Sequence, residues 1–210
     1  MIRKISQIIG LMLFMSVTAC TSNPYPPLES ATFIESATKN TADYRYLVGP
    51  GDSLNIFVWR NPEVTTTVTV RPDGYITTPL VEDVPVSGKT PTEIARLLEK
   101  ELSSYIRDPL VTVITEDHLG PFSEQVRIVG EADEPEFLPY VEDMTLLDVM
   151  IAVGGMTDFA DGNKASIVRI IDGQQNQYGV RLDDLIKDGD ISANVDMLPG
   201  DILIIPETFF

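Results

Sequence analysis

The chain has 210 residues, with 15 Lys and Arg residues against 32 Asp and Glu residues, so its formal net charge is −17. This acid excess argues against nucleic-acid binding and against docking on anionic lipids, because both need clustered basic residues. A single Cys excludes an internal disulfide framework, and a single His leaves little for zinc binding or imidazole chemistry. With 43% hydrophobic residues the composition is that of a folding protein.

The first nineteen residues have the layout of a secretory signal. Arg3 and Lys4 form a short basic region, an apolar run follows over residues 8–15, and small residues lead to Cys20. The apolar run is too short for a membrane span, which needs about 20 apolar residues. We therefore expect residues 1–19 to be a signal peptide that is removed on export.

The single Cys stands where that cleavage would occur. Residues 17–20, Val-Thr-Ala-Cys, resemble a bacterial lipobox, which implies that Cys20 carries the attached lipid. Thr21 follows in place of Asp, and by resemblance to lipoprotein sorting this implies the outer membrane, with the protein facing the periplasm. The alternative is an ordinary signal peptide with a Cys there by chance. Removal of the two basic residues of the signal leaves a net charge of −19.

A tether and a first module follow the signal. Residues 20–43 are rich in Thr, Ser, Asn and Pro, which is typical of a linker between the lipid and a folded domain. The first module is expected over residues 44–116. Its strands are expected over residues 54–59, 64–70, 75–80 and 110–114, with Pro72, Asp73 and Gly74 forming the turn between the second and the third.

One helix is expected between the third and fourth of these strands. The run Thr90-Pro91-Thr92-Glu93 offers an N-cap, a Pro at the first helical position and a capping-box Glu. The helix should end before Asp108-Pro109, because the residue before a Pro disfavours helical geometry. Its apolar face, at three- and four-residue spacing, comprises Ile94, Leu97, Leu98, Leu102 and Tyr105.

A second module is expected after a linker over residues 117–124. Its helix should start at Thr145, where Asp148 closes a weaker capping box, and Gly154-Gly155 should stop it. Strands are expected over residues 125–130 and 165–171, a β segment over residues 195–206 closes the module, and residues 207–210 form a tail.

Two turns at opposite ends of the chain share the pattern Pro-Gly-Asp-x-Leu-x-Ile. In each turn the Asp is expected to accept hydrogen bonds from backbone N–H groups at the mouth of a strand. The repetition indicates that both modules are built from related β elements. The residues of the two turns are Pro50, Gly51 and Asp52 in the first module and Pro199, Gly200 and Asp201 in the second.

The order and spacing of several blocks resemble a known pair of domains. In the first module the matching blocks resemble the polysaccharide export domain, and in the second they resemble a β-grasp domain of the soluble-ligand-binding (SLBB) type. The first set is Tyr46-Leu47-Val48-Gly49-Pro50-Gly51-Asp52-Ser53-Leu54, Val70-Arg71-Pro72-Asp73-Gly74-Tyr75-Ile76, Val86-Ser87-Gly88-Lys89-Thr90-Pro91-Thr92-Glu93 and Tyr105-Ile106-Arg107-Asp108-Pro109-Leu110-Val111. The second set is Val129-Gly130-Glu131, Met144-Thr145-Leu146-Leu147-Asp148-Val149, Ala152-Val153-Gly154-Gly155-Met156-Thr157 and Pro199-Gly200-Asp201-Ile202-Leu203-Ile204-Ile205-Pro206.

This resemblance implies an α+β fold and membership of the polysaccharide export lipoprotein family. It implies a non-enzymatic ring of identical subunits, without a cofactor or metal, through which a capsular polysaccharide or exopolysaccharide crosses the cell envelope. The implied partners are the exported polysaccharide, other copies of the chain and an inner-membrane copolymerase that regulates chain length.

One departure from the larger family members concerns the end of the chain. Those members carry a C-terminal helix that lines an outer-membrane pore, whereas only four residues follow Pro206 here. The chain therefore resembles the short members of exosortase-associated exopolysaccharide loci, which implies a separate outer-membrane β-barrel as partner. Phe209 and Phe210 either dock on a partner or form a frayed tail.

Other interpretations start from one turn or from individual residues. The first Pro-Gly-Asp turn resembles the opening of a LysM glycan-binding module, but residues 55–59 favour a strand where LysM would continue into a helix. Trp59 offers a face for stacking on a sugar, although a Trp near a strand end is more often a core residue. Asp52 and Asp201 suggest a glycosidase pair, yet their turns explain both structurally. His118 is expected at the surface of the linker.

A second function from another class remains open. A periplasmic glycan-binding lipoprotein would recruit or protect polymer without forming a conduit. The mass of the detergent-extracted protein separates the two, because a conduit ring requires an oligomer and the alternative does not.

Overall fold

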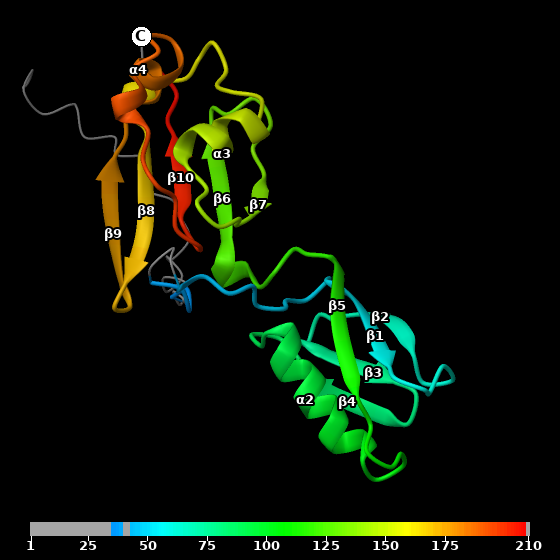
Figure 1. Cartoon of the computed structure of the whole chain (residues 1–210). Helices are drawn as coiled ribbons and strands as arrows, with labels where there is room; N and C mark the ends of the chain where they lie inside the picture. Colours follow the sequence, from blue (N-terminus) through cyan, green and yellow to red (C-terminus); the bar gives the residue numbers. More distant parts are fainter. Residues whose placement is uncertain (1–34, 40–42, 209–210) are drawn as a thin grey trace, which may run out of the picture. The chain divides into compact units, whose positions relative to one another are not determined.

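The computed structural model describes residues 35–39 and 43–208. Cys20, Phe209 and Phe210, together with the predicted signal peptide, lie outside the described residues. The described chain combines a few short helices with sheets whose strands pair mostly antiparallel, which confirms the expected α+β class (Figure 1). Among these residues no helix is long and apolar enough to cross a membrane.

The first module is built around strand β1 (Ser53–Val58). β1 pairs antiparallel with β2 (Thr66–Thr69) on one side and with β5 (Val111–Asp117) on the other. A separate hairpin joins β3 (Tyr75–Thr78) and β4 (Val81–Pro85). Period-two alternation sends one side of β1 inward, so that Leu54, Ile56 and Val58 are buried in the core.

Helix α2 (Pro91–Leu102) covers this core and packs on β5 and β4 (Figure 1). Its predicted start is confirmed, because Thr90 and Glu93 form the reciprocal capping box. The four-residue spacing of Ile94, Leu98 and Leu102 places all three on the buried face. Tyr105 departs from the prediction: it lies beyond the end of the helix and its side chain is exposed.

The second module is a mixed five-stranded sheet in the order β7-β6-β10-β8-β9. The last strand of the chain, β10, lies in the middle, parallel to β6 and antiparallel to β8. Three short helical turns, η2 (Phe122–Glu124), η3 (Gly162–Lys164) and η4 (Ile191–Ala193), connect the elements. The strands are β6 (Gln125–Gly130), β7 (Phe137–Pro139), β8 (Ser166–Ile171), β9 (Gln174–Gly179) and β10 (Ile202–Ile205), and the helices are α3 (Leu146–Ala152) and α4 (Leu182–Ile186).

Apolar side chains from the helix and the strands of this module meet in one core. From α3 the side chains of Leu146, Val149 and Met150 enter the core, and β10 contributes Leu203 and Ile205. The capping box predicted at the start of α3 is confirmed by the reciprocal bonds between Thr145 and Asp148. Because β10 is the central strand, a segment near the end of the described chain joins the two halves of the sheet.

The structure corrects several of the predicted bounds. The strand expected over residues 64–70 covers only Thr66–Thr69, because Val64 lies in the preceding turn. The predicted linker over residues 117–124 is not free of regular structure. β5 runs to Asp117, and Phe122–Glu124 form the helical turn η2. The strands β4, β7 and β9 were not expected.

Candidate functional site

The first Pro-Gly-Asp turn forms the entrance to β1. The N–H group of Asp52 donates to the carbonyl oxygen of Gly49 at 3.3 Å, which closes a four-residue turn. Gly51 adopts a φ of +94°, a backbone conformation that side-chain-bearing residues rarely take. The turn thereby sends Asp52 into the protein, where its side chain is fully buried.

The buried Asp52 carboxylate accepts hydrogen bonds from four donors. One oxygen accepts from the N–H group of Gly49 at 2.8 Å and from the hydroxyl of Tyr46. The other accepts from the N–H groups of Leu119 at 2.8 Å and Gly120 at 3.0 Å. A buried carboxylate is tolerated because each oxygen is hydrogen-bonded. Asp52 therefore joins the start of β1 to the segment that follows β5.

The same segment approaches the turn closely at a second point. A Cβ atom added to Gly49 would lie 2.1 Å from the carbonyl carbon of Gly120 and 2.2 Å from the nitrogen of Pro121. Only a Gly fits at this distance, which explains why the turn begins with one. Backbone packing and the Asp52 carboxylate thus fix the same segment.

The second Pro-Gly-Asp turn repeats this geometry at the entrance to β10. The N–H group of Asp201 donates to the carbonyl of Leu198 at 3.1 Å, and the N–H group of Leu198 donates to the Asp201 carboxylate at 2.8 Å. Gly200 has a φ of +85°. The fully buried Asp201 also pairs with Arg169 of β8, at 2.8 Å through Nε and 2.7 Å through Nη2. In each turn the N–H group three residues earlier donates to the Asp.

Asp52 and Asp201 do not belong to one shared site. Asp52 belongs to the entrance of β1, while Asp201 belongs to the sheet of the second module. Their oxygens face backbone N–H groups, a tyrosine hydroxyl or a guanidinium. Both carboxylates therefore act as structural acceptors, and the structure does not bring them together as the pair that a glycosidase requires.

The third predicted turn joins β2 to β3. Pro72 and Asp73 lie in the turn, and Gly74 has a φ of +82°. Arg71 forms ion pairs with Asp73 and, at 2.6 Å, with Asp83 of β4. These exposed pairs contribute little stability, so the backbone conformation at Gly74 is the main requirement of this turn.

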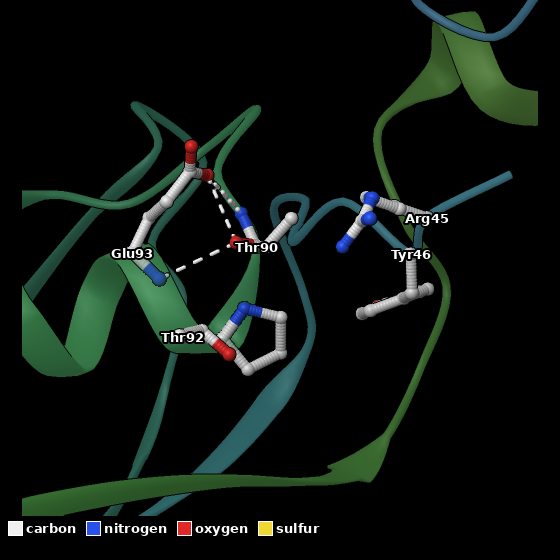
Figure 2. Close-up of a pocket in the computed structure, with 6 residues that line it drawn as sticks. Arg45, Tyr46, Thr90, Thr92 and Glu93 are labelled. Carbon is white, nitrogen blue, oxygen red and sulfur yellow. Dashed lines mark hydrogen bonds between the residues drawn. The ribbon is translucent and has the colours of Figure 1, made fainter. Parts of the chain in front are cut away.

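A surface pocket of about 590 Å³ opens at the start of α2. Figure 2 shows Arg45 and Tyr46 across from the capping box of Thr90 and Glu93. The Glu93 carboxylate accepts from the N–H group of Thr90 at 2.8 Å and from its hydroxyl at 2.9 Å. These two hydrogen bonds, the backbone one first, lower the pKa of Glu93. The polar groups at this helix end hydrogen-bond to one another within the capping box. Arg45 places a positive charge beside them.

We expect Thr90→Ala to lower the free energy of unfolding by about 1 kcal/mol, because the helix loses its N-cap hydroxyl. Urea denaturation followed by circular dichroism measures the change. Thr92→Ala is the matched control, since Thr92 is exposed in the first turn of the helix and does not serve as its cap. Equal losses in the two variants would contradict the assigned role of Thr90.

The structure also corrects the expectation for Trp59. It is not a core residue, because 54% of its surface is exposed, and its ring lies edge-on to that of Phe57 at a centroid distance of 6.3 Å. His118 is exposed, as expected, and its ring lies edge-on to Tyr46. The strand β1 after the first turn also confirms the prediction that distinguished this module from LysM.

Two residues of the site were not found from the sequence. Tyr46 stands in the block that carries the resemblance, but only the fold shows that its hydroxyl reaches Asp52. Arg169 lies 32 residues before Asp201, and nothing in its neighbourhood signals the pairing. A polar residue within the apolar run of β8 was the one available hint.

Tyr46 makes the first turn sensitive to alkali. Burial, followed by the hydrogen bond to Asp52, raises the pKa of Tyr46 above its ordinary value. The folded state therefore favours the neutral phenol. Its contribution to stability is complete below the unfolded pKa of about 10 and is lost as the pH rises above that value.

We expect Tyr46→Phe to make the alkaline loss of stability less steep, because this variant has no phenol to ionise. At neutral pH the variant should be less stable by about 2 kcal/mol, since a hydrogen bond to a charged group is lost. Urea unfolding at a series of alkaline pH values tests both effects. Parallel pH profiles for the variant and the parent protein would contradict the prediction.

Comparison with known proteins gives the two modules their family. The described part of the chain is a tandem of two α+β modules, and each of them matches a known domain. Residues 40–116 match the description "Polysaccharide biosynthesis/export protein", and residues 124–205 match "SLBB domain". The chain therefore belongs to the polysaccharide export family, as the blocks in the sequence indicated.

The chain is also similar to parts of two curated proteins. It is 26% identical over 187 residues to the EPS I polysaccharide export outer membrane protein EpsA of Ralstonia nicotianae, covering 77% of this chain and 47% of that protein. It is 28% identical over 131 residues to the exopolysaccharide production protein ExoF of Rhizobium meliloti, covering 57% of this chain and 30% of that protein. The chain thus spans less than half the length of these relatives.

Proposed function

We propose that this chain is a periplasmic lipoprotein of the outer membrane that assembles into a ring-like conduit for exopolysaccharide or capsular polysaccharide. The observation that carries the proposal is the order of its two domains, an export domain over residues 40–116 followed by an SLBB domain over residues 124–205. The name of the relative EpsA, a polysaccharide export outer membrane protein, supports the same role.

The work of such a conduit requires shape and polarity, and no residue has to perform a chemical step. Identical subunits close a ring when the same two different surfaces meet at each contact. The buried aspartates support this role, because their bonds to backbone groups keep each module rigid. The ring would join an inner-membrane copolymerase to an exit in the outer membrane.

The anchor of this assembly would be a lipid on Cys20. Several acyl chains on one residue hold a protein on a membrane firmly, whereas a single chain binds only weakly. Incorporation of labelled palmitate into the parent protein, and its loss in Cys20→Ser, tests the anchor. An unlabelled parent protein would show that the anchor is wrong.

Deletion of the gene tests the export role directly. We expect the deletion to stop the release of polysaccharide into the medium and to trap polymer in the periplasm, and a plasmid copy should restore release. The mass of the detergent-extracted protein tests the ring. A monomer would overturn it and favour a glycan-binding lipoprotein that forms no conduit.

A further inference from the structure

The sheet of the first module has an outward face that carries large apolar side chains. Because side chains alternate along a strand, the residues between the buried Leu54, Ile56 and Val58 of β1 point to the other side. Phe57 of β1 lies opposite Thr112 of β5 in the strand register. Neither the capping box nor the turns of this module account for the large apolar side chains on this outward face.

Four apolar side chains gather on this face and at its end. Phe57 is 41% exposed and Trp59 is 54% exposed, and the N–H group of Trp59 donates to the carbonyl of Leu110 at 2.9 Å, which brings the two chain segments side by side. Leu110 and Ile114 of the neighbouring strand region are 61% and 52% exposed. A contiguous apolar patch of a few hundred Å² on a protein surface is often a functional site, whereas apolar residues that are exposed singly need no explanation.

The polar residues that the strand register places opposite Phe57 and Ile114 are uncharged. Asn55 lies opposite Ile114 and donates through its amide to Thr67 at 3.3 Å and to Glu116 at 3.1 Å. Thr112 adds an exposed hydroxyl. Glu116 is the one charged member of this set and is hydrogen-bonded by Asn55, although 22% of the residues of the chain are charged. A surface of this kind fits a ligand that is rich in hydroxyl groups and carries little charge.

We propose that this surface, formed by Asn55, Phe57, Trp59, Leu110, Thr112 and Ile114 and called here the Trp59 surface, binds the passing polysaccharide. The apolar C–H faces of sugar rings stack on Trp59 and Phe57. Sugar hydroxyls donate to the side-chain oxygen of Asn55, whose NH2 group already bonds to Thr67 and Glu116, and bond to the hydroxyl of Thr112. The inference rests on the proposed export function and adds the binding surface and the class of polymer.

The charge of the protein narrows that class further. With a net charge of −17, the chain repels a polyanion that comes close to it. None of the six residues of the Trp59 surface is a Lys or an Arg, and the exposed Arg60 beside Trp59 is a single positive charge against this excess of acidic residues. The bound segment is therefore a neutral or weakly charged glycan.

The size of the surface favours a glycan over a second copy of the chain. Taking about 200 Å² for each whole side chain, the four apolar residues expose on the order of 400 Å² together. A stable contact between two proteins needs about 800 Å² on each partner. A stretch of a few sugar rings is matched by the smaller area.

The experiment uses the fact that Trp59 is the only tryptophan of the chain, so tryptophan fluorescence reports on this surface alone. The purified full chain is titrated with oligosaccharides prepared from the exopolysaccharide that the cells carrying this gene release, and with cellohexaose as a defined neutral probe. We expect a saturable change in emission with the first probe. If the emission of Trp59 does not change over the full titration with these oligosaccharides, the proposal is overturned.

Variants of the surface then separate stacking from an indirect effect. Phe57→Ala keeps the fluorescent Trp59 and should weaken binding at least about threefold. Trp59→Ala removes it, so its binding is measured by calorimetry and should be at least about tenfold weaker. Trp59→Phe should retain most of the affinity, because it keeps an aromatic face. Phe159→Ala is the matched control, since Phe159 is 57% exposed in the second module and should leave the affinity unchanged. Unchanged binding in Trp59→Ala would contradict the proposal.

Two further readouts distinguish glycan binding from a contact between copies and from the export function itself. If Trp59→Ala changes the mass of the assembly and leaves glycan binding intact, the surface is a contact between copies and the proposal is wrong. If the parent protein binds no glycan while deletion of the gene still stops release, the proposal fails and the export function stands. Saturable binding together with normal release from the deletion strain would retain the surface and overturn the export function.

Discussion

Replacement of Asp52 by Ala is expected to lower the free energy of unfolding by at least about 3 kcal/mol. The variant leaves four donors without their acceptor, and each unsatisfied buried donor costs about 1–3 kcal/mol. Urea unfolding followed by the fluorescence of Trp59 measures the effect within the first module, where both residues lie. The amides of Leu119 and Gly120, which donate to Asp52, should also exchange with solvent faster.

A graded second variant makes this prediction sharper. Asp52→Asn keeps the shape but replaces one oxygen by an NH2 group, so it can serve only part of the donor set. If the NH2 group takes the position near Tyr46, the tyrosine hydroxyl can rotate and accept, and only the Gly49 N–H group loses its partner. The loss should therefore be about 1–3 kcal/mol, smaller than in Asp52→Ala.

The control is an exposed carboxylate of the same module. Glu63 lies at the surface in the turn before β2, and Glu63→Ala should change stability by no more than about 0.5 kcal/mol. An Asp52→Ala variant as stable as Glu63→Ala would show that the four hydrogen bonds do not hold the module together.

Gly130→Ala is expected to lower the free energy of unfolding by more than about 4 kcal/mol and to disturb the pairing of β6 with β10 in the second module. Gly130 is the last residue of β6 and pairs with Ile205 of the central strand β10. A Cβ atom added there would lie 2.0 Å from the carbonyl oxygen of Ile205, which accepts from the N–H group of Glu131 at 2.9 Å. The backbone of β10 would have to move, and a loss of this size is exceptional for a single substitution.

Gly155→Ala isolates the steric part of this effect. Gly130 has a φ of +97° and Gly155 a φ of +98°, but nothing lies within 4 Å of a Cβ atom added to Gly155. Gly155→Ala therefore carries only the conformational penalty of a positive φ, about 1–2 kcal/mol. Thermal melting and urea unfolding of the two variants, followed by circular dichroism, give the difference. Equal losses would mean that β10 adapts to the added methyl group.

Much of the local structure followed from the sequence alone. Both capping boxes were predicted from the residues at their first and fourth positions, because a cap is a contact between near neighbours in the chain. The order of the matching blocks also indicated the family that the comparisons show. The strand β9 was missed because its residues, Gln-Gln-Asn-Gln-Tyr-Gly, show no apolar alternation at the edge of a sheet.

Long-range contacts were decided only by the tertiary structure. The sequence predicted that Asp52 and Asp201 accept hydrogen bonds from nearby N–H groups, but not that Asp52 reaches residues 67 and 68 positions away or that Asp201 pairs with Arg169. Trp59 shows the same limit, because its residue type favours the core, whereas the direction in which it points is set by the strand pairing around it. Turns and caps depend on neighbours in the chain, but burial depends on which strands and helices meet, and that is fixed only when the whole domain folds.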